Sequence, residues 1–247
     1  MIDLHSHILH GIDDGAADIR MALEMARRAA DDGVEVMACT PHFLPGVYDP
    51  AVPDVIARVA ELNDRLLAER VDLVVVTGCE AHVRPDMVER LKRSQILPIH
   101  TGRHVLCEAP TVTMPQHLDY LFINMIAAGY TPILAHVERY RWIDRALPFI
   151  KRMSESGVLM QVTAGSFVGE YGRTAQEWAM RLLLDGLVSI VASDAHDPAE
   201  RPPGLSKARK LVKAELGEHE ARRIFIERPE YILLGKSAVP AMSGATH

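Results

Sequence analysis

The chain is poor in cysteine and in aromatic residues. Its 247 residues include three cysteines, and Phe, Trp and Tyr together make up 5% of the sequence. A chain of this length buries a sizeable core without disulfide staples, and an odd number of cysteines in or beside apolar runs is typical of reduced, buried thiols. We therefore expect Cys39, Cys79 and Cys107 to be core residues of a cytoplasmic protein.

Two further classes of protein are disfavoured by features that the sequence lacks. The net charge of -6 comes without a run of basic residues, which argues against a dedicated surface for nucleic acid or anionic membranes. No uncharged apolar stretch approaches the ~20 residues that span a bilayer, and the first residues lack the basic and apolar regions of a signal peptide. We expect a cytoplasmic protein that binds no nucleic acid and does not insert into a membrane.

What the sequence does contain is a regular alternation of short β-branched runs with longer amphipathic segments. This alternation is typical of βα units repeated around a parallel sheet. Strands are predicted at residues 2–4, 34–39, 73–77, 105–107, 132–135, 158–162 and 188–192. Helices are predicted at 18–31, 52–69, 115–128, 144–156 and 174–184. Seven βα units favour an α/β barrel, although an open doubly wound sheet has the same local pattern.

The series of βα units is not interrupted by a linker or a low-complexity tract. A boundary between domains would be expected in such a segment. Residues 1–247 are therefore predicted to form a single domain, with one or two closing helices at about 205–235.

Histidines and carboxylates follow six of the seven predicted strands. In a parallel sheet or barrel these strand ends share one edge, where active sites are built. Side chains two positions apart in an extended segment point the same way, so His5 with His7, and Asp194 with His196, form chelating pairs. Nine residues are expected to converge at this edge: His5, His7, Asp14, His42, Glu80, Glu108, His136, Asp194 and His196.

This set of side chains indicates a metal site. One histidine pair alone is a weak signal, but agreement among six strand ends is a strong one. Imidazoles mixed with carboxylates suit Mn²⁺, Fe²⁺ or Zn²⁺ better than Mg²⁺ or Ca²⁺. One ion takes about four to six ligands, so two or three ions are predicted, with Glu80 or Asp194 as bridges. Other histidines, including His82 and His104, are interpreted as structural or surface residues.

At these residues the chain resembles the PHP (polymerase and histidinol phosphatase) superfamily, and within it the bacterial CpsB/YwqE-type protein-tyrosine phosphatases. The segments that carry the resemblance are 5–15, 40–42, 78–80, 135–140 and 193–196. The resemblance implies a distorted TIM-like (β/α)7 barrel and a three-metal site usually assigned to manganese or iron. It further implies that the substrate is phosphotyrosine in the tail of a bacterial tyrosine kinase, in the regulation of capsule or exopolysaccharide export.

The resemblance also implies a role for each polar residue. It places His5, His7, Glu80 and Asp194 around one ion, Glu80, Glu108 and His136 around a second, and Asp14, His42 and His196 around a third. Arg139 and Arg201 match arginines of the family, and planar bidentate donors beside metals suit a phosphate. The loop 43–53 and the segment 167–173 lie where such families vary, and we expect them to say least about the substrate.

The expected activity is metal-dependent hydrolysis of phosphate monoesters, with Mn²⁺ favoured over Fe or Zn. A small-molecule phosphatase of the same superfamily, such as a histidinol-phosphate phosphatase, is the main alternative. An amidohydrolase is less favoured because Glu108, not a lysine, ends the fourth predicted strand, and a non-catalytic metal-binding regulator is less favoured because no ligand is missing. A cysteine phosphatase is disfavoured because no cysteine is followed six positions later by arginine. The oligomeric state stays open.

Overall fold

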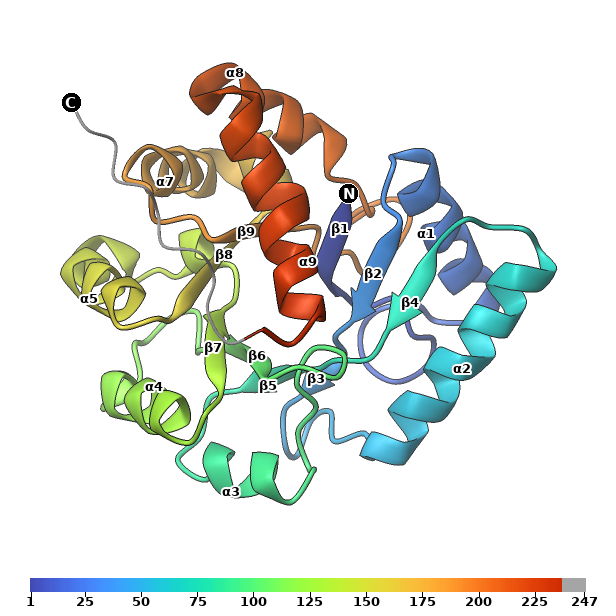
Figure 1. The fold of residues 1–247 in the computed structure, drawn as a ribbon, viewed down its shortest axis with the longest axis horizontal. Helices are drawn as coiled ribbons and strands as arrows, with labels where there is room; N and C mark the ends of the chain where they lie inside the picture. Colours follow the sequence, from blue (N-terminus) through green and yellow to red (C-terminus); the bar gives the residue numbers. More distant parts are fainter. Residues whose placement is uncertain (237–247) are drawn as a thin grey trace.

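The strands of the protein form a curled parallel sheet in the computed structural model, which describes residues 1–236 (Figure 1). The strands are β1 (Ile2–Ser6), β2 (Val36–Cys39), β3 (His42–Phe43), β4 (Val74–Val76), β5 (Glu80–His82), β6 (His104–Glu108), β7 (Thr131–Leu134), β8 (Leu159–Thr163) and β9 (Ile190–Ala192). They pair in the orders β1-β2-β4 and β3-β5-β6-β7-β8-β9. The segment after β9 joins β1, because Asp194 N donates to His5 O at 2.9 Å and His7 N donates to Ala195 O at 2.8 Å.

Two of the predicted strands continue beyond a break. β2 leads into β3 through Thr40 and Pro41, and proline cannot donate a hydrogen bond to the sheet. β4 leads into β5 through residues 77–79, where a Cβ on Gly78 would lie 3.2 Å from Cys39 O. Each of the seven predicted strands overlaps an observed strand, whereas β3 and β5 lie outside the predicted ranges.

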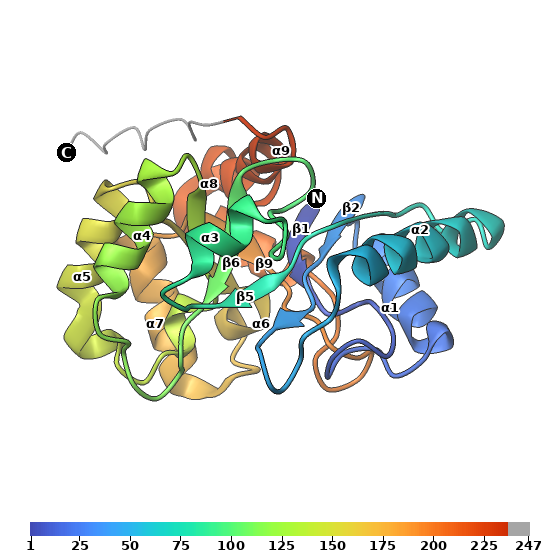
Figure 2. The same cartoon turned by 90° about the horizontal axis from the view of Figure 1, so that it is seen from below.

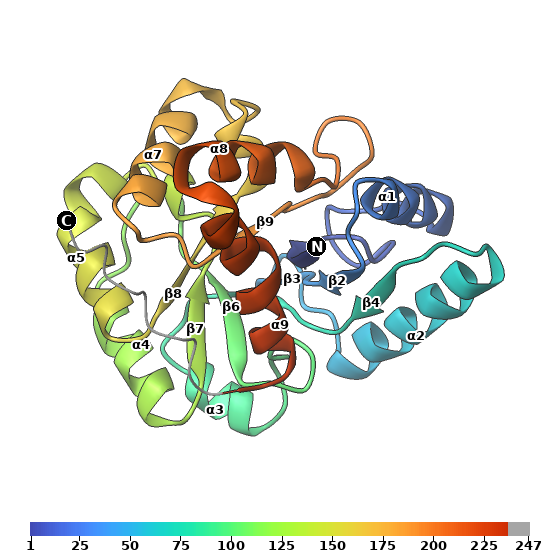
Figure 3. The ribbon, with the colours of Figure 1, turned by 45° about the horizontal axis from the view of Figure 1, so that its top comes forward.

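Helices cover the outside of the curled sheet (Figures 1 and 3). They are α1 (Ile19–Asp31), α2 (Val52–Ala68), α3 (Met87–Lys92), α4 (Leu118–Ala127), α5 (Ile143–Glu155), α6 (Ala164–Phe167), α7 (Gly172–Leu184) and α8 (Ser206–Arg222). In α1 the N-cap carboxylate of Asp18 accepts from Met21 N at 2.9 Å, and the buried residues recur with helical spacing. The five predicted helices are all observed, and α3 and α6 lie outside the predicted ranges.

The chain closes with two further helical segments, a π-helical turn at Arg223–Glu227 and α9 (Arg228–Leu233). The domain predicted for residues 1–247 includes 237–247, which lie outside the described residues. Within residues 1–236, every helix is too short or too polar to cross a bilayer.

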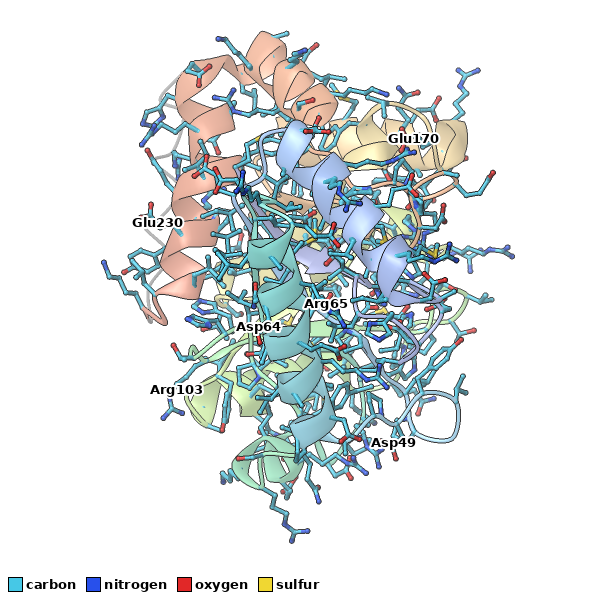
Figure 4. The ribbon with its side chains drawn as sticks, turned by 90° about the vertical axis from the view of Figure 1, so that its right-hand side faces the viewer. Asp49, Asp64, Arg65, Arg103, Glu170 and Glu230 are labelled. Carbon is cyan, nitrogen blue, oxygen red and sulfur yellow. The ribbon has the colours of Figure 1, made fainter. Side chains whose placement is uncertain are left out.

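The two ends of the curled sheet are built differently. At the amino end of the strands α9 lies across the sheet (Figure 2). Its Ile232 belongs to a buried apolar cluster with strand residues such as Leu4, Leu106 and Ile133. The carboxyl end carries the loops that follow the strands. Asp49 and Glu170 from these loops lie on one side in Figure 4, whereas Arg103 and Glu230 lie on the opposite side. Polar residues that end strands therefore gather on the Asp49 and Glu170 side.

Candidate metal and phosphate site

The structure brings the nine predicted ligands together at the carboxyl end of the curled sheet. They are His5 in β1, His7 and Asp14 in the segment after it, His42 in β3, Glu80 in β5, Glu108 at the end of β6, His136 after β7, and Asp194 and His196 after β9. Six of these side chains are at most 5% exposed: His5, His7, Glu80, His136, Asp194 and His196. The cluster is therefore buried on most sides and opens to solvent beside Asp14, whose side chain is 44% exposed.

The centre of the cluster contains two histidines of β1 and its extension. The Nε2 atoms of His5 and His7 lie 3.3 Å apart, close to the separation that metal bonds of about 2.1 Å impose on neighbouring ligands. His5 Nε2 lies 3.1 Å from Asp194 Oδ1 and 3.5 Å from Glu80 Oε1. His7 Nε2 lies 3.5 Å from the same Asp194 oxygen and from Glu80 Oε2. Both imidazoles thus point at a single space between two carboxylates.

Two further groups of side chains flank this centre. Glu80 Oε2 lies 3.0 Å from His42 Nδ1, and Glu80 Oε1 lies 3.0 Å from His136 Nε2, so this one carboxylate faces both sides. Candidate ligand atoms lie within 4.8 Å of one another in three groups, which are His5, His7 and Glu80, then His42, Glu80 and Glu108, and finally His7, Asp14, His42 and His196. The sequence-based prediction that Glu80 bridges two ions fits this geometry.

A buried glutamine determines which nitrogen of His5 faces the centre. Gln161 Oε1 in β8 accepts from His136 N at 2.9 Å, and a backbone N–H can only donate, so the amide oxygen must face it. His5 Nδ1 lies 3.1 Å from the same oxygen and must therefore also donate. This leaves His5 Nε2 as the nitrogen that can bind a metal. The sequence reasoning missed Gln161, whose signal was a polar residue within an otherwise apolar strand.

Asp13 likewise determines which ring nitrogen of His7 faces the centre of the cluster. Asp13 Oδ2 accepts from His42 N at 3.0 Å and from His7 Nδ1 at 2.7 Å, which leaves His7 Nε2 to face the centre. Asp13 Oδ1 accepts from Gly15 N at 3.0 Å. A Cβ at Gly15 would overlap the His7 carbonyl oxygen, so this turn requires glycine. The sequence reasoning named Asp14 and missed Asp13, although the two are adjacent.

In the absence of metal, three histidines of the cluster, His5, His7 and His136, have raised pKa values that favour their charged forms. Burial disfavours charge, but Glu80 and Asp194 outweigh it and raise the pKa of His5 to about 10. Burial is likewise outweighed at His136, where Glu108 and Glu80 raise the pKa to about 9. Despite burial and the charge of Glu80, hydrogen bonds from His136 and His82 lower the pKa of Glu108 to about 2. The protonated imidazoles thus supply positive charge between carboxylates, and metal binding has to displace those protons.

Asp194 connects the histidines to two arginines. Its Oδ1 faces His5 and His7, whereas its Oδ2 pairs with Arg139 Nη1 and lies 2.7 Å from Arg201 Nη2. Asp194 adopts a left-handed backbone conformation with φ of 54°, which is uncommon for residues other than glycine. The arginine side chains are 23% and 29% exposed, so their guanidinium groups border both the cluster and solvent. The predicted phosphate-binding arginines therefore lie beside the predicted metal ligands.

A family model for capsular polysaccharide synthesis, CpsB/CapC, matches residues 1–234. The chain belongs to the CpsB/CapC family. It is 33% identical to the tyrosine-protein phosphatase YwqE of Bacillus subtilis over 94% of this chain and 91% of YwqE. It is 28% identical to the tyrosine-protein phosphatase CpsB of Streptococcus pneumoniae over 95% of this chain and 98% of CpsB. The predicted resemblance to this family is confirmed.

A solved structure extends the CpsB/CapC match to three dimensions. It comes from crystal structures of YwqE from Bacillus subtilis and CpsB from Streptococcus pneumoniae, described as unique metal-dependent tyrosine phosphatases. The match has a TM-score of 0.93 and 32% sequence identity, and it covers 97% of this chain and 96% of the other. The curled α/β sheet is thus shared with a CpsB/CapC protein of known structure.

The cysteines of this CpsB/CapC chain are unsuited to nucleophilic catalysis. Cys39, Cys79 and Cys107 are fully buried. Burial raises the pKa of Cys79 to about 12, and it raises the pKa of the other two thiols as well. A thiol must ionise to act as a nucleophile. Their interpretation as core residues agrees with this burial.

One histidine that was interpreted as structural or surface lies at the edge of the CpsB/CapC cluster. His82 is two residues after Glu80 in β5, so both side chains project from the same face of the strand. Its Nδ1 lies 3.6 Å from Glu108 Oε2, and its side chain is 27% exposed. His82 thus contacts a predicted ligand, and the spacing from Glu80 was the signal that could have identified it.

Proposed function

We propose that this chain is a metal-dependent protein-tyrosine phosphatase. Its substrate is phosphotyrosine on a bacterial tyrosine kinase that takes part in capsular or exopolysaccharide biosynthesis. The observation that carries the proposal is Asp194, whose one oxygen faces the histidine cluster and whose other oxygen pairs with Arg139 and Arg201. Guanidinium groups can bind phosphate in a bidentate manner, so two of them beside a cluster of candidate metal ligands support the proposal. The names of the relatives YwqE and CpsB as tyrosine-protein phosphatases support the same activity.

The proposed fold is a distorted TIM-like (β/α)7 barrel of the PHP type in a single domain that spans residues 1–247. Taking β2 with β3, and β4 with β5, as two interrupted strands gives seven strands in sequence. The hydrogen bonds between β1 and the segment after β9 support a closed arrangement. We place the protein in the cytoplasm because its three thiols are free.

The proposed cofactor is a set of two or three divalent ions, with Mn²⁺ favoured over Fe or Zn. The residues fit such a group, because imidazole and carboxylate atoms converge without a saturating set of hydrogen bonds. His196 Nε2 is one example, a buried nitrogen that has no hydrogen-bond partner among residues 1–236. His5, His7, Glu80 and Asp194 would hold one ion, Glu80, Glu108 and His136 a second, and Asp14, His42 and His196 a third. Bound divalent ions neutralise phosphoryl charge and promote attack by water.

The protein's own residues would bind and orient the phosphate. Arg139 and Arg201 reach the cluster from two different strand ends and would exchange the carboxylate oxygen of Asp194 for phosphoryl oxygens. Their charge would also stabilise the negative charge that spreads over the phosphoryl group during transfer. A tyrosine phenolate leaves more readily than an alkoxide, so a protein acid at the leaving oxygen is not essential.

The proposal is tested by offering three substrates to the purified full-length protein with Mn²⁺ and with chelator. A phosphotyrosine peptide, histidinol phosphate and a cyclic amide represent the proposed activity and its two enzymatic alternatives. We expect hydrolysis of the peptide with Mn²⁺ and its loss with chelator. Activity on histidinol phosphate alone would replace the tyrosine phosphatase with a small-molecule phosphatase. Phosphatase activity that survives chelator would refute the metal-dependent mechanism.

A further inference from the structure

Tyr171 lies between the two arginines of the proposed phosphate site. It belongs to the segment between α6 and α7, which was expected to say least about the substrate. The Arg139 guanidinium carbon lies 4.5 Å from the centre of the Tyr171 ring, which is a cation–π distance. Arg201 Nε donates to the Tyr171 hydroxyl oxygen at 3.4 Å. A single side chain thus contacts both arginines, one through its ring and the other through its hydroxyl.

The Tyr171 ring packs against the backbone of Gly165, where the absence of a Cβ leaves space for it. A Cβ at Gly165 in α6 would lie 2.9 Å from Tyr171 Cε2 and would overlap the Glu170 carboxylate. Glu170 N donates to Gly165 O at 3.0 Å, which holds the chain before Tyr171 against α6. Gly165, Tyr171 and Arg201 also line a small cavity of about 100 Å³. The ring is therefore packed against the backbone and is not a freely moving surface side chain.

This contact matters because, among residues 1–236, the other side-chain contact of both guanidinium groups is the ion pair with Asp194. Each guanidinium reaches Asp194 Oδ2 from a long, flexible side chain, and a bound phosphate would take over that contact. Tyr171 contacts different parts of the two arginines, the Arg139 face and the Arg201 Nε. Those contacts leave the Nη atoms of both arginines free to turn from Asp194 to a phosphate.

We propose that Tyr171 is a positioning residue that holds Arg139 and Arg201 in the geometry that binds phosphate. The inference rests on the proposed function, since it concerns the same site. Tyr171 acts through the arginines, so its loss weakens phosphate binding and leaves the metal ligands in place. The substrate Michaelis constant should respond more than the turnover number, because the arginines contact the phosphate in the ground state as well.

The experiment compares Tyr171→Leu and Tyr171→Phe with the wild type, using full-length Mn²⁺-loaded protein. Calorimetry measures the dissociation constant of inorganic phosphate, and kinetics with a phosphotyrosine peptide give KM and kcat. We expect Tyr171→Leu to weaken phosphate binding about 10-fold, and Tyr171→Phe, which keeps the ring, about 3-fold. The manganese content should match that of the wild type in both variants.

The matched control is Tyr130→Leu. It removes a similar pair, in which the Arg103 guanidinium carbon lies 5.5 Å from the Tyr130 ring centre. Arg103 lies on the side of the molecule opposite to Glu170, the residue before Tyr171, so this change should leave phosphate binding unaltered (Figure 4). Gly165→Ala is a second route to the same effect, because it displaces the Tyr171 ring without changing it.

The outcomes separate this inference from the proposed function. Phosphate binding that stays unchanged in Tyr171→Phe, in Gly165→Ala and in a folded Tyr171→Leu would overturn the role of Tyr171, even if the peptide is hydrolysed. Weakened phosphate binding in these variants would support that role, even if the wild type hydrolyses no phosphotyrosine. A loss of manganese that accompanies the weaker binding would show a structural effect on the cluster and would overturn the positioning role.

Discussion

At the two ends of the curled sheet, the pKa values of buried histidines are shifted in opposite directions. His5 at the carboxyl end is 0% exposed and His104 at the amino end is 1% exposed, so burial is the same. Burial is outweighed at His5 by Glu80 and Asp194, which raise its pKa to about 10. At His104 burial lowers the pKa to about 4, and neither ring nitrogen has a hydrogen-bond partner within residues 1–236. Neighbouring carboxylates, and not depth, therefore distinguish the candidate site from the packed end.

The largest effect is expected from removing Glu80, the carboxylate that two of the three groups of the cluster share. Glu80→Gln takes away a charge that faces His5, His42 and His136. We expect manganese to be lost and kcat/KM for the phosphotyrosine peptide to fall about 10³-fold, as several kcal/mol of metal-derived stabilisation would require. Metal analysis and steady-state kinetics measure both quantities.

The matched control for this substitution is Glu138→Gln. Glu138 is also buried at the carboxyl end, but its Oε1 accepts from Thr163 N at 3.1 Å and from Ser166 Oγ at 2.7 Å. A glutamine oxygen can accept the same two hydrogen bonds, so metal content should be kept. An equal loss of manganese in both variants would mean that removing any buried carboxylate at this end disrupts metal binding. The prediction that Glu80 is a metal ligand would then lose its support.

The second prediction is that the stability of metal-free protein depends on pH differently from that of metal-loaded protein, because of the pKa shifts. The folded pKa values of His5 and His136 are about 10 and 9, above the value of about 6.5 expected in the unfolded chain. Their contribution to stability is therefore complete below pH 6.5 and is lost as the pH rises to about 10. Metal-free protein should lose stability over this range, whereas protein with Mn²⁺ should not, because deprotonated imidazoles bind metal better.

Urea unfolding at pH 6.5, 8 and 9.5, with chelator and with Mn²⁺, measures this difference. Calorimetry of Mn²⁺ binding at pH 7 in two buffers of different ionisation enthalpy should also detect proton release. If the metal-free protein were equally stable at all three pH values, the charged histidines would not hold the cluster together.

The sequence predicted which polar side chains converge at the carboxyl end of the sheet, because their signal is local. A polar residue that ends a β-branched strand can be recognised without knowing its partner, and alternation in the strand pairs His5 with His7. The same reasoning does not reach Gln161, which contacts His5 across 156 positions, or Tyr171, which contacts arginines that follow two other strands. Those contacts depend on how the sheet curls, which periodicity does not determine.

The missed strands have a similar explanation. β3 and β5 contain two and three residues and begin shortly after Pro41 and Gly78, so no alternating pattern is long enough to be recognised. They form only because neighbouring strands pair with them, as when Glu80 N donates to Pro41 O at 3.0 Å. Tertiary contacts, and not local propensity, define these strands.

The third prediction is a smaller loss of metal affinity, caused by substitution of Gln161. Gln161→Met keeps the length of the side chain but removes the oxygen that accepts from His5 and His136. Residues that orient metal ligands typically change metal affinity by about 10- to 100-fold, and we expect a loss in this range. Gln161→Glu restores an acceptor oxygen and should recover most of the affinity, as measured by Mn²⁺ titration.

Met160→Leu controls for packing at the neighbouring position of β8, because Met160 is fully buried in the large apolar core of the protein. Imidazole ¹⁵N chemical shifts in metal-free protein give a second measure, since Gln161 fixes the nitrogen of His5 that donates. If Gln161→Met bound Mn²⁺ as tightly as the wild type, the orientation of His5 would depend on other contacts.

The smallest effect is expected at the opposite end of the sheet. His104→Leu replaces a buried imidazole whose ring nitrogens have no partner within residues 1–236, so it removes a desolvation cost. The folded pKa of about 4 lies below the unfolded value of about 6.5, so His104 costs stability as the pH falls through that range. We expect His104→Leu to stabilise the protein by about 1 kcal/mol at pH 7, and by more at pH 5. Urea unfolding at both pH values measures this gain, and kcat/KM should not change. A destabilised variant would mean that His104 has a polar partner, and the two ends of the sheet would then differ less than their geometry indicates.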